Sequence, residues 1–236
     1  MVAALAAPSP EAVHRAIAAA VRSAPCAVVT GDDRTALGAS LRGVTGRGEP
    51  ESRLRTSVRD AAPQAIVDWQ VAVADGPYCA LLDVIRPYAA PFGGTARLLS
   101  VTLANGRTDL MAEDLVIPRV TMPDFAGYLQ LDYVSSDGSL LHMHEARGGP
   151  PYAPDSTPVF GEPKPPAFKG WAVDEPFGTD LIVAVASSVP LFRVARPATD
   201  TLEAYLHDLR AALDQAARGG ARISASVLLV RSSAKR

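Results

Sequence analysis

The sequence predicts an α+β protein, in which a small αββαβα layer domain precedes a β-sandwich-like (immunoglobulin-like) domain with a packed C-terminal helix. This prediction depends on two sequence patterns and on the linker that separates them. Residues 10–88 alternate amphipathic helix-length segments with short apolar runs, whereas residues 98–145 contain short apolar runs separated by turn residues. A proline- and glycine-rich linker at residues 89–96 lies between the two patterns, and we place the domain boundary there.

Composition limits the function classes that the chain can belong to. It has 236 residues, of which 48% are hydrophobic and 20% charged, so it can bury a sizeable core. Its 20 prolines and 18 glycines argue against a helical bundle. The net charge of −2 gives no electrostatic reason to expect nucleic acid as a partner. No apolar run approaches the ~18 residues of a transmembrane segment.

The first domain, predicted at residues 10–88, begins with a helix after a flexible N-terminus at residues 1–9. Ser9-Pro10-Glu11 combines an N-cap, a proline at the first helical position and an acid in the first turn. Apolar residues then recur every four positions, at Val13, Ile17 and Val21. Strands are expected at Cys26–Thr30 and Leu37–Thr45, with a turn at Gly31–Arg34 between them.

A second helix, a third strand and a short third helix complete this domain. They are expected at Glu51–Ala62, Ile66–Val73 and Tyr78–Arg86. The resulting order of elements resembles that of BON-like domains, which bind other proteins or envelope surfaces in characterised cases. The resemblance covers about residues 10–88 and depends on element order rather than on particular residues.

The two cysteines, Cys26 and Cys79, lie at the start of the first strand and the start of the last helix of this domain. If they meet, they close a loop of about 54 residues, which stabilises the fold by ~4 kcal/mol in the chain-entropy model. Such a bond favours a periplasmic or other extracytoplasmic location. Two unrelated buried thiols in a cytoplasmic protein are the alternative.

The second domain, predicted at residues 97–236, begins with short strands. They are expected at residues 98–103, 115–122, 128–134 and 140–144, and Ser136-Asp137-Gly138 is a hairpin turn between the last two. Alternation places Gln130 and Asp132 on one face of the third strand, and Leu129 and Leu131 on the other. Such regular spacing of short strands is typical of a β-sandwich.

After a long loop at residues 148–169, the stretch from Trp171 to Phe192 predicts a strand, a turn and a strand that form the central hairpin of the sandwich. Trp171 and Phe177 are expected to be packing anchors, and Gly178 to be required by the turn. Asp200 with Glu203 has the spacing of a capping box and begins a helix that ends at Gly219-Gly220. A strand at residues 223–230 and a solvated basic tail at residues 232–236 follow.

The second domain resembles the bacterial domain-of-unknown-function family numbered 4384, which commonly follows serine/threonine kinase or caspase-like peptidase domains. The matching segments are Phe125–Tyr133, Ser136–Gly138, Gly170-Trp171, Pro176–Leu181, Ala186–Phe192 and Arg196-Pro197, with Tyr128, Asp132, Trp171, Phe177, Gly178 and Pro190 as the structural signature. The resemblance implies an accessory module without established catalytic residues. The chain itself lacks the kinase signatures.

The sharpest candidate for chemistry is His142-Met143-His144-Glu145, where the family resemblance fails. Residues two apart on a strand share a face, so both imidazoles could bind one metal, with Glu145 or Asp137 as a third ligand. Because the chain offers no second histidine cluster, we favour solvated histidines and expect no metal or cofactor.

Three further features have a structural and a functional interpretation. Ser187 follows a strand without the elbow motif of a serine hydrolase, so we interpret it as a polar strand end. Asp132 lies among apolar residues and, if buried, needs a partner, for which an arginine or backbone donors are expected. The proline-rich loop forms either a docking surface or a simple cover, and its aromatic residues are Tyr152, Phe160 and Phe168.

The function expected from these observations is that of a non-catalytic sensor or scaffolding module in bacterial signalling or the cell envelope. Its partner would be a protein or a small ligand, with a possible link to a serine/threonine kinase system. One alternative is a carbohydrate- or peptidoglycan-binding module, for which a groove lined by exposed aromatic residues would be evidence. The other is a hydrolase with a metal or serine site near His142 and Ser187.

Overall fold

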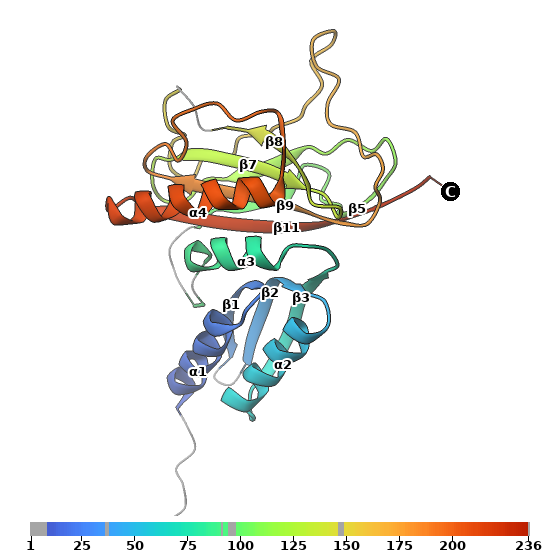
Figure 1. Cartoon of the computed structure of the whole chain (residues 1–236). Helices are drawn as coiled ribbons and strands as arrows, with labels where there is room; N and C mark the ends of the chain where they lie inside the picture. The colour runs from blue at the N-terminus through green and yellow to red at the C-terminus, as the bar shows by residue number, and fades with distance from the viewer. Residues whose placement is uncertain (1–8, 36–37, 91, 94–97, 146–148, 236) are drawn as a thin grey trace, which may run out of the picture.

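The computed structural model describes residues 9–35, 38–90, 92–93, 98–145 and 149–235, and it confirms the α+β class. Figure 1 shows a layered arrangement in which two helices cover a small sheet, a third helix separates that sheet from a larger one, and loops cover the far side. The predicted flexible N-terminus lies outside the described residues apart from Ser9. Much of the predicted linker at residues 89–96 also lies outside them.

The N-terminal elements follow the predicted order. They are α1 (Pro10–Ser23), β1 (Ala27–Thr35), β2 (Gly38–Gly46), α2 (Glu49–Ala61), β3 (Ile66–Ala74) and α3 (Cys79–Ile85), followed by a 3-10 turn at Arg86–Tyr88. The strands form a three-stranded sheet in the order β1-β2-β3. β1 is antiparallel to β2, whereas β3 is parallel to it, with α2 as the crossover.

Local signals placed the helices correctly. Ser9 caps α1 by accepting a hydrogen bond from the backbone of Ala12, and Pro10 is the first helical residue. The predicted stripe of α1, including Ile17, is buried against Leu54 and Val58 of α2 in a core that these helices share with the sheet. Burying each such side chain contributes roughly 1.5–3 kcal/mol.

The predicted turn at Gly31–Arg34 is wrong, because β1 continues through it. Residues of β1 pair with β2 as far as Thr35 opposite Gly38, so the connection falls at residues 36–37, outside the described part of the chain. A cross-strand hydrogen bond from Arg42 to Asp32, 2.6 Å long, stabilises the extension. Turn-forming residues were overridden here by pairing with a neighbouring strand.

Helix α3 joins the two predicted domains. Its buried residues Leu81 and Leu82 belong to a core that also contains Val44 of the small sheet and Val183 and Leu229 of the large one. Figure 1 shows α3 between the two sheets. A hydrophobic core therefore crosses the predicted boundary, so the two halves are packed together rather than only linked.

The C-terminal half contains one large sheet and one small sheet. Its strands are β4 (Ser100–Leu103), β5 (Asp109–Met111), β6 (Pro118–Thr121), β7 (Tyr128–Val134), β8 (Ser139–His144), β9 (Thr179–Ser187), β10 (Thr199–Thr201) and β11 (Ile223–Ser233). The six-stranded sheet has the order β10-β8-β7-β9-β11-β5, and β4 pairs with β6 in a two-stranded sheet. The strand β5 was not predicted from the sequence.

The predicted hairpin from Trp171 to Phe192 is wrong. Strand β9 is central, as expected, but it pairs with β7 and β11, which are distant in sequence. The segment at Trp171 instead runs beside Leu115, to which Ala172 forms an isolated bridge. The local pattern identified two extended segments correctly but could not identify their partners.

A second core lies between the large sheet and β4–β6. It contains Leu131, Ile182 and Val230 of the large sheet with Val101 and Val120 of the small one. Helices α3 and α4 (Leu202–Arg218) cover the opposite face of the large sheet. The arrangement is mixed α and β, and the immunoglobulin-like sandwich that we expected is not confirmed.

The C-terminal elements differ from the prediction at two ends. Thr201, not Asp200, caps α4, because its hydroxyl accepts from the backbone of Ala204 while the Asp200 side chain is engaged elsewhere. Strand β11 extends to Ser233, so the predicted tail is partly structured. Ser232 is buried and bonds both Gly178 and Asp180.

Candidate functional site

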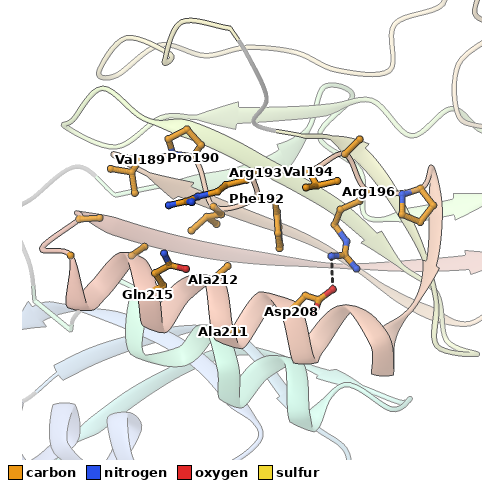
Figure 2. Close-up of a pocket in the computed structure, with 16 residues that line it drawn as sticks. Val189, Pro190, Phe192, Arg193, Val194, Arg196, Asp208, Ala211, Ala212 and Gln215 are labelled. Atoms are coloured by element: carbon orange, nitrogen blue, oxygen red, sulfur yellow. Dashed lines mark hydrogen bonds and ion pairs between the residues drawn. The ribbon is translucent and has the colours of Figure 1, made fainter.

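A groove of about 840 Å³ lies between the segment at residues 189–197 and helix α4. Figure 2 shows the 189–197 segment forming one side and the helix forming the other. The helix side consists mainly of small residues, Ala211, Ala212 and Ala216. The opposite side carries larger apolar side chains, of which Val194 is 77% exposed to solvent.

The sequence of α4 explains why the groove is open. Tyr205, Leu209 and Leu213 recur at helical spacing and point into the core between the helix and the large sheet. The neighbouring alanines are too short to reach the 189–197 segment. A strip of small side chains beneath an apolar segment leaves room that another molecule can fill.

Arg196 holds one end of the 189–197 segment against the helix. Its guanidinium donates to Asp200 over 2.6 Å and to Asp208 over 2.8 Å. It also lies 5.2 Å from the ring centres of both Phe192 and Tyr205. Burial works against the charged form, but the hydrogen bonds that Arg196 donates to these carboxylates raise its pKa above the usual value.

The pKa of Asp200 shifts in the complementary direction. Burial opposes its ionisation, yet the hydrogen bonds from Arg196 and from the backbone of Thr201 outweigh that effect and lower the pKa of Asp200. Both partners are therefore charged over the whole physiological pH range, and because Asp208 also bonds Arg196, this end of the groove carries one excess negative charge.

Arg193 also lines the groove, but its surroundings differ from those of Arg196. It is exposed, and no ion pair joins it to any of the residues that the structure describes. Figure 2 shows its side chain extending along the 189–197 side of the groove, past Phe192. Arg193 is thus available to bind an anionic group, whereas Arg196 is already engaged.

A buried polar cluster lies next to Arg196, between β7, β8 and α4. At its centre is Asp132, which is only 1% exposed. One carboxylate oxygen accepts from Gln130 over 2.7 Å and from Nδ1 of His142 over 2.6 Å, and the other accepts from the Tyr205 hydroxyl over 2.5 Å. Burial, and after it the charge of Asp132, raises the pKa of Tyr205 far above its usual value.

The expectation that Asp132 is a structural residue with a partner agrees with this arrangement, but the expected arginine or backbone partners are wrong. Side chains of Gln130, His142 and Tyr205 fill that role. On the far side of the imidazole, Nε2 of His142 is buried without a hydrogen-bond partner and lies 4.0 Å from Asp200. The cluster thus extends from the core to the ion pair between Arg196 and Asp200.

The cluster contains residue types that occur in catalytic sites, but a substrate has no access to it. The His142 side chain is 1% exposed, as is that of Asp132, so no substrate atom can reach the imidazole in this conformation. Its hydrogen bonds serve to satisfy buried polar groups.

The two histidines of the candidate metal motif do not meet. A register shift between Leu131 and Asp132 opposes His142 to Asp132 and His144 to Leu131, which belong to opposite faces of β7. His142 therefore points towards α4, whereas His144 points towards the second core. The expectation of solvated histidines is wrong, because the His142 side chain is buried and that of His144 packs among aromatic rings. Among the described residues, no group of three metal-binding side chains is close enough to hold an ion.

His144 and two aromatic residues of the candidate docking loop form a cluster of their own. Its ring lies 4.7 Å from that of Phe160 and 5.7 Å from that of Tyr152. Burial lowers the pKa of His144, and a smaller opposing effect comes from Glu145. Phe168 makes an edge-to-face contact with Trp171, with the ring centres 5.2 Å apart. Tyr152 and Phe160 pack against the second core, so this part of the loop covers that core.

The remaining signature residues have structural positions. Trp171 and Phe177 pack, half-buried, against the second core. A Cβ at Gly178 would lie 2.9 Å from the Ser136 hydroxyl, so a larger residue would require the Ser136 side chain to move. Pro190 lines the groove, and Tyr128 lines a smaller hollow with His144 and Glu145.

Ser187 is fully buried, and its hydroxyl accepts from the backbone of Val189 over 3.3 Å. Among the described residues, the Ser187 hydroxyl forms no hydrogen bond with His142. These contacts agree with its interpretation as a polar strand end.

The predicted disulfide is present. Cys26 and Cys79 are bonded, with their Cα atoms 4.3 Å apart, and they join the start of β1 to the start of α3. Asp83 strengthens the same junction by accepting from the backbone of Cys26 over 2.8 Å and from Arg86 over 2.7 Å. The bond fixes α3 in the position where it meets the large sheet.

No family model, curated protein or solved structure matches this chain. The resemblances to the family numbered 4384 and to BON-like domains therefore stay predictions. Within the described residues, none of the helices has both the length and the apolar character required to cross a bilayer.

Sequence reasoning missed the groove because its parts are separate in the chain. Arg196, Asp208 and the alanines of α4 show no recognisable motif. One available signal was Tyr205, a residue with a polar group at a core position of an otherwise leucine-lined helix face. A buried tyrosine hydroxyl needs a partner, and Asp132 was the acid that lacked one.

Proposed function

We propose that this chain is a non-catalytic binding module of a bacterial signalling or cell-envelope system, and that it binds its partner in the groove beside α4. The observation that supports this most is the shape of that groove, a hollow of about 840 Å³ with small helix residues on one side and both apolar and charged side chains in its lining. Its size falls in the range of ligand-binding sites in proteins.

The partner that fits best is an apolar peptide segment with an acidic side chain. The exposed apolar residues Val189 and Val194 offer a surface for nonpolar side chains. Arg193 is free to bind a carboxylate, whereas Arg196 is neutralised by Asp200 and Asp208. An arginine beside an apolar groove favours a carboxylate that can accept two parallel hydrogen bonds.

The two alternatives have less support. A carbohydrate site is usually built on exposed aromatic platforms, whereas Phe192 is the only aromatic side chain lining the groove and Arg196 lies over its ring. A hydrolase needs an accessible base, and His142 is enclosed.

The proposal includes the context suggested by the sequence. The second core between the large sheet and β4–β6 supports a β-sandwich-like accessory domain at residues 97–236. The disulfide supports a periplasmic or extracytoplasmic location. A link to a serine/threonine kinase system rests on the family resemblance alone.

The groove can be tested with anilinonaphthalene sulfonate, a fluorescent probe that combines apolar rings with one anionic group. We expect saturable binding to the folded protein at one site. Ala212→Phe fills the groove and should abolish binding, whereas Arg193→Gln should weaken it about tenfold by removing the charge-assisted contact.

The matched control is Ala217→Phe, which makes the same change at an exposed position of α4 outside the groove. It should bind the probe like the unmodified protein. Unfolding curves of all variants exclude a loosened fold as the source of any difference. Equal binding by the Ala212 and Ala217 variants would reject the groove as the site.

A further inference from the structure

We propose that the outer edge of β3 is a dimerisation surface, on which β3 of a second copy of this chain pairs in antiparallel orientation. The two small sheets would then form one continuous sheet across a two-fold axis. This inference concerns the N-terminal sheet and is independent of the groove.

The first argument is the unprotected length of this edge. β3 has nine residues and pairs with β2 on one side without any register shift. Among the described residues, no other strand pairs with it, so its outward backbone N–H and C=O groups face solvent. The edge contains no proline or bulge and a single charged residue, Asp68, whereas prolines, bulges and charged side chains are the usual devices that prevent strands from pairing between molecules.

The other edges of the small and the large sheet are partly covered or short. On the β1 edge, Gly93 donates a hydrogen bond to the carbonyl of Gly31 over 2.9 Å. The edges of the large sheet, β5 and β10, have only three residues each. β1 is as long as β3 but is partly covered, so β3 has the longest uncovered edge among the described strands of these two sheets, which indicates a surface that is covered in the assembled protein.

The second argument is that β3 is complementary to itself. In an antiparallel pair centred on Gln70, the large exposed Ile66 lies opposite Ala74 of the second copy, which is buried in its own chain, and Asp68 lies opposite Ala72. Large side chains thus face small ones, and the two carboxylates do not oppose each other. Ile66 is 78% exposed in the single chain, an unusual state for isoleucine that such pairing would relieve.

The opposite face of the strand supports the same register. There Val67 meets Val73, and Trp69 meets Val71. Val67, Trp69 and Val73 are only half-buried in the single chain. Pairs of β-branched and aromatic residues across antiparallel strands are among the stabilising combinations in sheets.

We favour a second copy over an unrelated peptide because, in a single register, the side chains on both faces of β3 are complementary to those of another β3. A foreign strand would gain the backbone hydrogen bonds, but nothing in β3 selects its side chains. Two-fold symmetry makes every favourable pair away from the axis occur twice.

The test is the solution mass of the full chain, measured by light scattering over a range of concentrations. We expect a reversible shift towards twice the 24.7 kDa mass of the chain. Gln70→Lys and Gln70→Glu each place two like charges at the two-fold axis, and each should weaken the dimer about tenfold or more.

Mixing the Gln70→Lys and Gln70→Glu proteins should restore the dimer, because the axis then joins opposite charges. Gln64→Lys is the matched control, since Gln64 is exposed just before β3, and it should dimerise like the unmodified chain. A chain that stays monomeric at every concentration overturns the proposal. So does a dimer that the Gln70 variants leave intact, or one that their mixture does not restore.

Discussion

The two histidines of β8 are separated by one residue, yet they belong to different environments. His142 bonds the buried carboxylate of Asp132 on the face that α4 covers, whereas His144 lies among aromatic rings on the face that the 149–171 loop covers. One face is thus held by a small set of directional polar contacts, and the other by many weak apolar ones.

The difference teaches how each face should respond to change. In a buried polar cluster, removing one member leaves the others without hydrogen-bond partners. A single substitution therefore lowers the free energy of unfolding by a large amount. On an apolar face, the loss follows the area and volume removed. The predictions below test this contrast, beginning with the largest expected effect.

Asp132→Ala should destabilise the protein most, by about 3–5 kcal/mol, because it leaves donors of Gln130, His142 and Tyr205 buried and unpaired. Urea unfolding followed by circular dichroism measures this change. Asp124→Ala, which breaks an exposed ion pair with Arg222, is the control and should cost less than about 1 kcal/mol. Similar losses for both variants would remove the distinction between buried and exposed carboxylates.

On the apolar face, Trp171→Ala should cost about 2–3 kcal/mol, because the half-buried ring packs against the second core. Phe168→Ala removes the ring in edge-to-face contact with Trp171 and should cost only about 1 kcal/mol. Thermal unfolding of both variants provides the comparison. A Trp171 variant that melts like the unmodified protein would contradict the role of this residue as an anchor.

Tyr205→Phe isolates one hydrogen bond of the polar cluster. It keeps the ring but removes the hydroxyl donor to Asp132, and should cost about 1–2 kcal/mol. Tyr152→Phe makes the same change beside His144, where the contact is 3.3 Å long and half-exposed, and should cost about 0.5 kcal/mol or less. Equal losses of unfolding free energy in urea for the two variants would contradict the inferred difference between the polar and the apolar face of the sheet.

The smallest effect is a pH dependence from His144. Its pKa is lowered in the folded protein, so the unfolded chain binds the proton more readily. This contribution to stability is complete above the unfolded value of about 6.5 and is lost as the pH falls towards the lower folded pKa.

His144→Gln should flatten the decline in unfolding free energy in the pH range just below about 6.5, whereas His207→Gln, at an exposed position of α4, should leave it unchanged. Urea unfolding at a series of pH values measures both slopes. An unchanged slope in the His144 variant would mean that burial of this imidazole is not coupled to folding.

The sequence by itself determined the class of fold and the order of the N-terminal elements, and it offered one possible disulfide pair. It also determined the alternation along β7, with Asp132 on one face and Leu131 on the other. These features depend on local periodicity, on caps such as Ser9 and on the presence of only two cysteines, all of which can be read within a short window.

Only the tertiary structure decided the partners of β9, the separation of His142 from His144, and the groove between α4 and the 189–197 segment. Each of these depends on contacts between residues far apart in the chain. A register shift in one hairpin moves a side chain to the other face of a sheet, and side-chain periodicity within one strand does not record where the neighbouring strand shifts.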